Sequence, residues 1–382
     1  MGNLADRRRI VVAVSDDLLT DQRVLRTCDA LFAAGYKVEL IGRAWPDVAP
    51  LKSPYRSLKM KLLFKRGALF YAELNIRLFL KLIISGADAF YANDTDTLLA
   101  VGLAARLRRK PFVFDGHELF PDVPELIGKP FVQKVWRWVE RRFIPQASLC
   151  VTVNRSLAEE YERRYGVGFI VVRNLSSHTS PRNSKFTLQN SKFKTILYQG
   201  AVNKGRCVKE LIDAMEFLHD CRLVVAGAGD LLDDMRHYAA AKPYGDRIIF
   251  TGRLKPEELK SLTEQATLGF CLMENMGLNY YFSLPNRIGD YAAAHVPVLA
   301  NDYPEIRRVL DAHQIGRCID EAVIYNPRLL AESVTKLIAE WDAMPPSERN
   351  SRFESALEDL SWEKEQKILI DNIDTIFVKK SS

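Results

Sequence analysis

The chain has 382 residues, of which 47% are hydrophobic and 27% are charged, and its formal net charge is +6. A single core rarely grows past roughly 250–300 residues, so this length predicts two domains. No apolar run reaches the ~18 residues that a membrane-spanning helix needs, and the first residues show no signal-peptide pattern. The six scattered cysteines form no CxxC pair, which favours reduced thiols in a cytoplasmic protein.

The first half of the chain alternates short apolar strands with helices. The expected strands lie at residues 9–15, 37–43, 88–94, 111–116, 148–154 and 169–174. The expected helices lie at residues 21–34, 69–84, 96–108, 131–144 and 155–165. Apolar strands that alternate with helices predict an α/β domain with a parallel sheet covered on both faces.

A polar stretch rich in Ser and Asn separates this half from a second, similar alternation. We place the linker at residues 179–194, after an N-terminal domain at 1–178. A second doubly wound domain follows at 195–361, and we expect a C-terminal helix at about 362–382 to pack back on the first domain. Two such domains predict a central cleft, in which ligands bind beyond the carboxyl ends of the strands.

Groups that suit a phosphate follow several strands of the second domain. Gly200 ends the run TILYQG, and Lys204 and Arg206 precede the next helix. A guanidinium there can hold a diphosphate as a bidentate fork, and a solvated surface turn is the alternative. Gly227 begins a GxG that lacks the third glycine of the dinucleotide fingerprint, which argues against a dehydrogenase. Arg253, after the run RIIFTG, is placed to line a nucleotide base.

The stretch SLPNRIGDYAAAHVPVLAND, residues 283–302, predicts a turn, a helix at 286–295 and a buried strand. The first amides of a helix have no internal partner and attract anions. We therefore expect Leu284, Asn286 and Arg287 to lie beside a ligand that carries phosphate. Asp290 can accept two hydrogen bonds from a ribose diol. Its alternative role is to stabilise the helix dipole, worth roughly 0.3–1 kcal/mol.

Four runs, in this order, resemble the retaining glycosyltransferases of family 4. They are YQGAVNKGRCVKELIDAM, LVVAGAGD, IIFTG and SLPNRIGDYAAAHVPVLANDYPEI. The resemblance implies the GT-B fold, in which two Rossmann-like domains face a cleft and the second holds a nucleotide-sugar donor. It places Arg206 at the diphosphate and Asp290 at the ribose. The family motif has Glu where this chain has Phe282, and Glu274 is out of register, so the donor sugar stays open.

The run PFVFDGHELFPD contains the polar residues that stand closest to a strand end in the first domain. Asp115, His117 and Glu118 resemble the DxHE of the same family, and a structural polar loop is the alternative. The resemblance implies that His117 contacts the donor sugar near its reacting carbon. It also implies that Asp115 and Glu118 orient His117 or the acceptor hydroxyl. No HExxH occurs, which excludes a zinc protease of that type.

Two acidic clusters in the first domain have competing interpretations. The family resemblance places Asp16, Asp17, Asp21 and Arg23 on the acceptor side, whereas Asp21 would equally suit a helix N-cap. The sequence Asp94-Thr95-Asp96 matches a metal-binding DxD pair. We favour a role for Thr95 or Asp96 in capping the helix at 96–108, and we expect neither a metal nor another cofactor, because Arg206 and helix amides meet the phosphate charge.

Residues 52–66 contain many basic residues and no acidic one, and they lead into the helix expected at 69–84. Arg66, Glu73, Arg77 and Lys81 recur at helical spacing and share one face. Residues 52–84 could therefore contact an anionic membrane, which would suit a polyprenyl-linked acceptor. The alternative is a helix packed on the core with a solvated basic face.

These patterns together predict a metal-independent retaining glycosyltransferase of the hexosyl or N-acetylhexosaminyl type. The expected donor is a nucleotide-diphosphate sugar, with a UDP-sugar favoured. The expected acceptor is a glycan or lipid-linked glycan of cell-envelope polysaccharide synthesis, used in the cytoplasm or at the inner face of the membrane. The alternatives are a non-catalytic GT-B subunit that supports a partner transferase and a nucleotide-sugar epimerase. No base-stacking motif accompanies the basic residues, so we expect no nucleic-acid partner.

Overall fold

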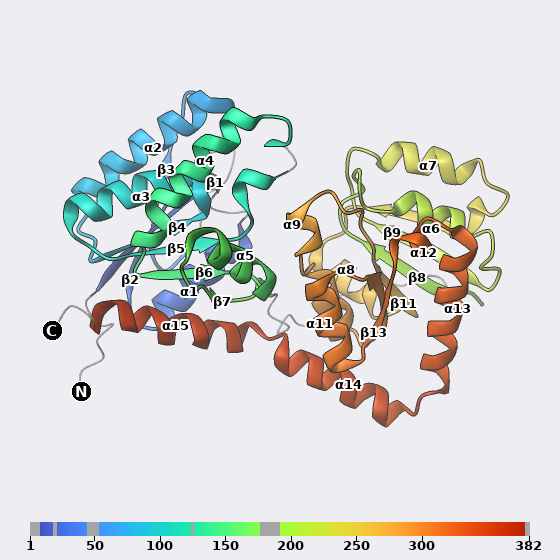
Figure 1. Cartoon of the computed structure of the whole chain (residues 1–382). Coiled ribbons are helices and arrows are strands. Elements are labelled where there is room, and N and C mark those ends of the chain that lie inside the picture. The colour runs from blue at the N-terminus through green and yellow to red at the C-terminus, as the bar shows by residue number, and fades with distance from the viewer. Residues whose placement is uncertain (1–7, 18–20, 44–52, 124–125, 176–191, 379–382) are drawn as a thin grey trace. The chain divides into compact units, whose positions relative to one another are not determined.

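The computed structural model describes residues 8–17, 21–43, 53–123, 126–175 and 192–378. Residue contacts divide the chain into unit 1, Met1–Asn174 with Glu363–Ser382, and unit 2, Leu175–Trp362. Each unit contains its own parallel sheet (Figure 1). The linker expected at residues 179–194 lies largely outside the described residues.

Unit 1 is built on a seven-stranded parallel sheet in the order β3-β2-β1-β4-β5-β6-β7. Its strands are β1 (Arg9–Asp17), β2 (Lys37–Arg43), β3 (Arg56–Met60), β4 (Ala89–Asn93), β5 (Phe112–Gly116), β6 (Leu149–Thr152) and β7 (Ile170–Val171). Residues 89–93 and 112–116 are buried throughout, as strands covered on both faces require. The expected doubly wound α/β architecture is confirmed.

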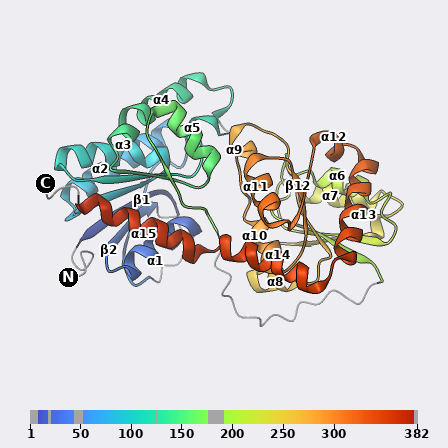
Figure 2. The same cartoon turned by 60° about the horizontal axis from the view of Figure 1, so that its bottom comes forward.

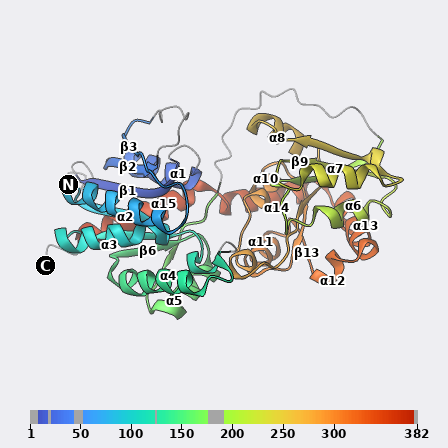
Figure 3. The same cartoon turned by 90° about the horizontal axis from the view of Figure 1, so that it is seen from above.

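Helices cover both faces of this sheet. They are α1 (Gln22–Ala33), α2 (Gly67–Ile84), α3 (Asp94–Arg108), α4 (Pro130–Phe143), α5 (Arg155–Tyr165) and α15 (Trp362–Val378). Helices α2, α3 and α4 lie side by side over one face, and α1 and α15 cover the other (Figures 1, 2 and 3). The buried Glu365 of α15 accepts hydrogen bonds from the backbone N and Nε of Arg173, at 2.7 and 2.8 Å.

One strand of unit 1 was not expected from the sequence, and one expectation for this unit is wrong. The basic stretch at 52–66 contains an edge strand, β3, whose Arg56–Met60 pairs in parallel with Glu39–Arg43. Charged side chains are tolerated there because an edge strand is solvated on one side. Helix α3 begins at Asp94 rather than 96, with Asn93 as N-cap, so neither Thr95 nor Asp96 caps it. Thr95 Oγ1 instead donates to Glu140 Oε1 at 2.7 Å.

Unit 2 repeats the plan with a six-stranded parallel sheet in the order β10-β9-β8-β11-β12-β13. Its strands are β8 (Lys194–Gln199), β9 (Cys221–Ala226), β10 (Ile248–Gly252), β11 (Leu268–Cys271), β12 (Val298–Asn301) and β13 (Gly316–Ile319). Its helices are α6 (Val208–Ala214), α7 (Leu232–Ala240), α8 (Pro256–Thr263), α9 (Leu278–Tyr281), α10 (Arg287–Ala293), α11 (Pro304–His313), α12 (Glu321–Ile324), α13 (Pro327–Ala343) and α14 (Pro346–Asp359).

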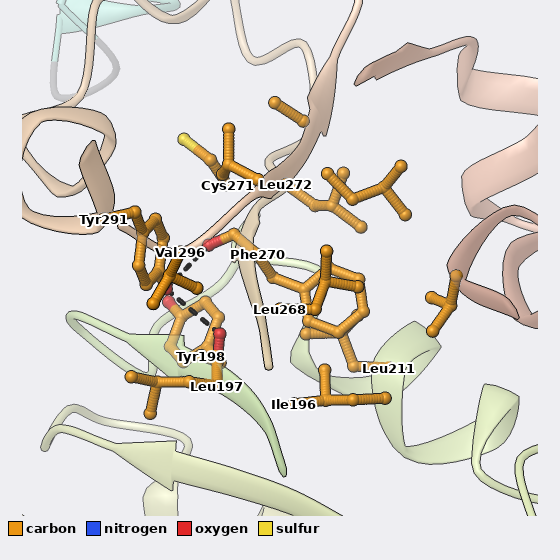
Figure 4. Close-up of a cluster of buried hydrophobic side chains, with 14 of the residues drawn as sticks. Ile196, Leu197, Tyr198, Leu211, Leu268, Phe270, Cys271, Leu272, Tyr291 and Val296 are labelled. Carbon is orange, nitrogen blue, oxygen red and sulfur yellow. Dashed lines mark hydrogen bonds between the residues drawn. The ribbon is translucent and has the colours of Figure 1, made fainter. Parts of the chain in front are cut away.

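Tyr291 attaches helix α10 to the centre of this sheet. Its ring lies against Gly269 of β11, where an added Cβ would come within 2.6 Å of the ring atoms. Its hydroxyl donates to the carbonyl oxygens of Leu197 and Phe270, at 3.0 and 3.2 Å (Figure 4). Because Leu197 is in β8 and Phe270 is in β11, one side chain fixes α10 over the junction of these two strands.

We predict that Gly269→Ala lowers the free energy of unfolding by roughly 1–3 kcal/mol, because the new methyl group would overpack the Tyr291 ring. Gly168→Ala is the matched control, since no heavy atom lies within 4 Å of its added Cβ. Urea titration of both variants against the wild type checks the prediction. Equal stabilities for the two variants would contradict the packing described for Tyr291.

Candidate functional site

The strand order of each sheet reverses at one point. In unit 1 the reversal lies between β1 and β4, and in unit 2 it lies between β8 and β11. Chain connections leave in opposite directions on the two sides of such a point, which opens a crevice beyond the carboxyl ends of the strands. The residues that follow β8 and β11, and those that follow β1, β4 and β5, are therefore the candidates for ligand binding.

Arg287, the first residue of α10, is a buried cation beside the reversal point of unit 2. The residue is 9% exposed, and its guanidinium carbon lies 5.1 Å from the centre of the Tyr198 ring. Its Nη1 is buried and has no hydrogen-bond partner among the described residues. The ring supports the guanidinium by a cation–π contact, but a buried charge without a hydrogen-bonded partner is costly.

Arg206 is a second cation of the same kind. It is half-buried in the loop after β8, and its guanidinium carbon lies 5.4 Å from the centre of the Tyr280 ring. Its Nε is buried, and no residue that the structure describes forms a hydrogen bond with it. Burial raises the pKa of the Tyr198 phenol, and the nearby positive charges of Arg287 and Arg206 offset part of this rise. Neither arginine forms an ion pair with a carboxylate of the described residues.

Glycines let the backbone come close to these cations. An added Cβ on Gly200 would lie 3.2 Å from Nη2 of Arg287, and the backbone of Gly200 has a φ of 139°. An added Cβ on Gly227 would lie 1.7 Å from the carbonyl oxygen of Gly200. Only glycine fits at 227 without movement of the backbone, so the glycine at this position serves the packing of the loops after β8 and β9.

Asp290 lies one turn into α10, where the side chain of Gln199 reaches it. Gln199 Nε2 donates to Asp290 Oδ2 at 3.0 Å, and Gln199 Oε1 accepts from Thr263 Oγ1 at 2.9 Å. Thr263 thus sets the orientation of the Gln199 amide. The other expected donor-side residues differ in exposure: Arg253 and Asn286 are exposed, and Leu284 is half-buried against the core.

The loop after β11 comes back to the loop that carries Arg206. The backbone N of Glu274 donates to the carbonyl oxygen of Gly205 at 2.9 Å. The fully buried Asn301 holds the start of this loop, because its amide bonds both the N and the O of Met273, at 2.6 and 2.8 Å. Sequence reasoning missed Asn301, although its position at the end of a buried strand was a signal. Phe282 ends the short helix α9 and is half-buried.

In unit 1 the structure brings together Arg23 and Asp115, two of the expected site residues. Arg23 Nη2 lies 2.8 Å from Asp115 Oδ1, and both residues are buried. Tyr91 OH donates to Asp115 Oδ2 at 2.8 Å. Burial opposes ionisation of Asp115, but Arg23 and His117 outweigh it and hold the pKa of this carboxyl well below its usual range. Asp115 is thus a buried anion that is already paired.

His117 lies between two carboxylates. Its Nδ1 is 3.0 Å from Asp94 Oδ2, its Nε2 is 3.5 Å from Asp115 Oδ2, and its backbone N donates to Asp94 Oδ1 at 2.8 Å. Burial alone would lower the pKa of His117, but Asp94 and Asp115 raise it to about 10. The imidazole is therefore held as a cation. Asp94 has a φ of 59°, a strained value for a residue that is not glycine.

Asp96 is buried beside Asp94 in the first turn of α3. Burial, reinforced by the charge of Asp94, raises the pKa of Asp96 to about 8. At neutral pH this carboxyl is therefore mostly protonated. Within the part of the chain that the structure describes, no group of three or more His, Cys, Asp or Glu side chains is arranged to hold a metal ion.

The remaining expected residues of unit 1 lie near the same strand ends. Asp21 caps α1, because its side chain accepts from the backbone N of Arg23 and of Val24, at 3.1 and 3.0 Å. Asp16 is exposed near the end of β1, and Asp17 pairs with Arg43 in the ladder between β1 and β2. Glu118 is half-buried, and its carbonyl oxygen accepts from Tyr161 OH at 2.7 Å. The structure thus places both Arg23 and His117 beside Asp115, at 2.8 and 3.5 Å.

We predict a pH-dependent effect of His117→Gln on stability. The folded state holds a proton on His117 up to about pH 10, whereas an unperturbed histidine releases it near 6.5. Stabilisation by this cation is thus complete below about pH 6.5 and is lost as the pH rises to about 10. The cost of His117→Gln should be on the order of 3 kcal/mol at pH 6 and should shrink toward pH 10.

Urea titrations at several pH values measure this cost. His237→Gln is the control, since His237 is exposed on α7. A cost for His117→Gln that does not change between pH 6 and pH 10 would show that His117 is not a cation in the folded state.

None of the helices among the described residues has both the length and the apolar composition that a membrane-spanning helix needs.

Comparison with known proteins gives two family matches that follow one another along the chain. The family described as "Glycosyltransferase Family 4" matches residues 21–174. The family described as "Glycosyl transferases group 1" matches residues 179–356. The two matches together span most of both units.

One curated relative is the alpha-monoglucosyldiacylglycerol synthase of Streptococcus pneumoniae. It is 24% identical over 176 residues, which cover 42% of this chain and 38% of that protein. The match thus spans well under half the length of the relative.

Solved structures share the fold over nearly the whole chain. Sucrose-phosphate synthase from Thermosynechococcus elongatus has a TM-score of 0.73 at 16% identity, covering 98% of this chain and all of that one. A glycosyltransferase from Rickettsia africae has a TM-score of 0.74 at 13% identity, covering 99% of this chain and 100% of that one.

Anabaena HepE in complex with UDP has a TM-score of 0.73 at 13% identity, covering 96% of this chain and 100% of that one. The family matches on both units agree with the shared GT-B fold. The chain therefore belongs to glycosyltransferase family 4, the retaining GT-B enzymes that transfer a sugar from a nucleotide sugar.

Proposed function

We propose that this glycosyltransferase transfers a hexosyl or N-acetylhexosaminyl group from a UDP-sugar to a glycan or lipid-linked glycan, without a metal ion. The choice of UDP is supported by the similar Anabaena HepE, which was solved in complex with UDP and with UDP-glucose. The lipid-linked acceptor is supported by the distant glucosyldiacylglycerol synthase relative. The six thiols of the chain are free, which supports a cytoplasmic site of action.

The observation that carries this proposal is the pair of arginines in unit 2 that lack a carboxylate partner in the described residues. A buried guanidinium is stable only with an anion and with hydrogen bonds to its N–H groups. Arg287 Nη1 and Arg206 Nε are buried donors without a hydrogen-bond partner in the part of the chain that the structure describes. Aromatic rings support both guanidiniums on one side. The N–H edges are then left for the oxygens of a diphosphate, which guanidinium forks recognise in bidentate geometry.

In the proposed reaction the bond between the sugar C1 and the diphosphate oxygen breaks while the acceptor hydroxyl attacks on the same face. The departing diphosphate takes up the acceptor proton, so no protein base is needed. Negative charge grows on the diphosphate as the bond breaks, and positive charge grows on the sugar. Arg206 and Arg287 would stabilise that growing negative charge, an interaction stronger in the transition state than in the ground state. Two fixed cations would thus replace the metal ion of other transferases.

The remaining donor contacts follow from the positions on α10 and its neighbours. Asp290, with Gln199 beside it, is proposed to bind the ribose hydroxyls, while Arg253, Leu284 and Asn286 are proposed to lie along the base and the phosphates. The contact of His117 with the donor sugar stays a prediction. A histidine with a pKa raised to about 10 is a hydrogen-bond donor at neutral pH, so we propose that it acts as a cation and not as a general base.

We also propose that unit 1 contacts an anionic membrane through residues 52–84. The exposed side of α2 carries Leu69, Ile76 and Leu80, so it is more apolar than the solvated basic face that was the alternative. The carboxylate of Glu73 accepts hydrogen bonds from the backbone N of Leu63 and of Phe64, at 2.8 to 3.0 Å. This arrangement leaves apolar and basic groups outside, which supports contact with lipid.

We predict that Arg206→Ala and Arg287→Met each weaken UDP binding about 10- to 100-fold, because charge-assisted hydrogen bonds contribute about 1.5–3 kcal/mol. Arg328→Ala, at an exposed position of α13, is the matched control and should bind UDP like the wild type. Isothermal titration calorimetry measures the three affinities. If both site variants bound UDP with wild-type affinity, the assignment of Arg206 and Arg287 to the diphosphate would be wrong.

We predict that one nucleotide class raises the melting temperature of the wild type, and that the rise survives EDTA. A ligand at about 100 times its dissociation constant stabilises the folded state by about 2.7 kcal/mol. UDP-, GDP-, ADP- and dTDP-sugars form the panel. A shift that disappears with EDTA would contradict metal independence, and no shift at all would contradict donor binding. Conversion of the donor sugar without any acceptor would indicate an epimerase instead.

A further inference from the structure

Large apolar side chains that are exposed gather on one layer of unit 1. Twelve of the nineteen such side chains in the described residues lie on α2, α3, α4 and the segments just before α2 and α4. The most exposed are Ile84 at 85%, Leu63 and Phe131 at 78%, Leu107 at 67%, Ile76 at 62% and Ile127 at 61%. Exposed patches of this kind on a water-facing surface usually mark an interaction site.

The exposed apolar residues form stripes along each helix. On α2 the stripe begins at Leu69 and continues through Ile76, Leu80 and Ile84, at spacings of 7, 4 and 4. On α4 it contains Phe131, Val135 and Trp138, at spacings of 4 and 3. Such spacings place the members of each stripe on one side of a helix.

Direct contacts hold the three helices in one layer. Arg108 of α3 donates to the carbonyl oxygen of Ile83 in α2 at 3.2 Å. An added Cβ on Gly102 of α3 would come within 2.3 Å of the Phe143 ring of α4. Seen from above, the helices of this layer run alongside one another (Figure 3). Their outer sides therefore belong to a single surface, which we call the α2–α4 surface.

The exposed charges of these helices are all positive, and two of them, Arg77 and Arg137, are paired with the less exposed carboxylates of Glu73 and Asp122. The exposed charged residues of the three helices are Arg77, Arg106, Lys134, Arg137, Arg141 and Arg142. The acidic residues of these helices, Glu73, Asp94, Asp96 and Glu140, are half-buried or buried. Within residues 67–84, 94–108 and 130–143 no acidic side chain is exposed.

We propose that the α2–α4 surface docks on an anionic phospholipid bilayer. Exposed apolar stripes with interspersed cations and no anions match the acyl boundary and the negatively charged headgroups of such a bilayer. Trp138 suits this boundary because its ring is apolar and its N–H is polar.

A second copy of the chain is a worse occupant. In a symmetric dimer the same surface faces itself, which would set cations against cations, and like charges across an interface are repulsive.

The proposal extends the membrane contact of residues 52–84 to α3 and α4, and it does not depend on nucleotide binding. It is tested by vesicle flotation of the full chain in 0.1 M salt. The vesicles contain phosphatidylcholine alone or phosphatidylcholine with about 30% phosphatidylglycerol. The wild type should float with the anionic vesicles, should bind those without phosphatidylglycerol at least tenfold more weakly, and should be released by 0.5 M salt.

Two variants change only α3 and α4. Lys134→Gln with Arg141→Gln should weaken binding roughly 25-fold, because each basic residue near an anionic surface contributes about fivefold. Leu107→Gln with Trp138→Gln should weaken binding at least tenfold at every salt concentration. The matched controls replace exposed residues of unit 2: Arg328→Gln with Lys336→Gln, and Phe217→Gln with Leu329→Gln. Both controls should bind like the wild type.

Three results would overturn the proposal: no flotation of the wild type with anionic vesicles, equal losses in the α3–α4 variants and the controls, or concentration-dependent dimers that the α3–α4 variants abolish. Melting temperatures within a few degrees of the wild type show that a variant is folded. A variant with a much lower melting temperature is replaced by Lys134→Gln alone, whose side chain is exposed. UDP binding measured on the same samples separates this proposal from the proposed function, because the vesicle result stands whether or not UDP binds.

Discussion

The contact of Tyr291 with Gly269 determines where Arg287 and Asp290 of unit 2 lie. Because position 269 has no side chain, the Tyr291 ring reaches β11 and its hydroxyl bonds one carbonyl oxygen in each central strand. Helix α10 is thereby fixed at the point where the strand order reverses, and Arg287 and Asp290 are carried on the same helix within one turn of the ring. The placement of these two side chains beside Gly200 and Gln199 follows from this one contact.

Buried charged side chains pair with one another in unit 1, whereas in unit 2 the buried Arg287 has no carboxylate partner among the described residues. In unit 1, Arg23, Asp115, His117 and Asp94 neutralise one another through direct contacts, so their geometry is set before any ligand arrives. In unit 2, Arg287 has aromatic support but no carboxylate partner in the described residues. Preorganised groups cost no rearrangement during a reaction, whereas an unpaired cation gains most from an incoming anion. The contrast matches a role in positioning for unit 1 and a role in diphosphate binding for unit 2.

The sequence predicts the parallel sheets well, because apolar strands that alternate with helices have few other solutions. It also predicts Arg206 and Arg287 as candidates, since basic residues after strands stand out. It does not predict that β3 lies in a basic stretch, because edge pairing depends on β2, whose paired residues are 17 positions away in the chain. Nor does it predict the hydrogen bond between Asn301 and Met273 or the one between Asp94 and His117, since these bonds join residues that are 28 and 23 positions apart. That no described carboxylate pairs with Arg287 is likewise visible only once its surroundings in space are known.

The central claim is that Arg206 and Arg287 bind the donor diphosphate, and a crystal structure of the chain with UDP tests it most directly. The account predicts the diphosphate within hydrogen-bond distance, about 2.7–3.2 Å, of Arg287 Nη1 and Arg206 Nε. It predicts no metal ion between the phosphates, with the ribose hydroxyls at Asp290. A diphosphate bound away from both guanidiniums, or held by a metal ion on acidic side chains, would contradict the account.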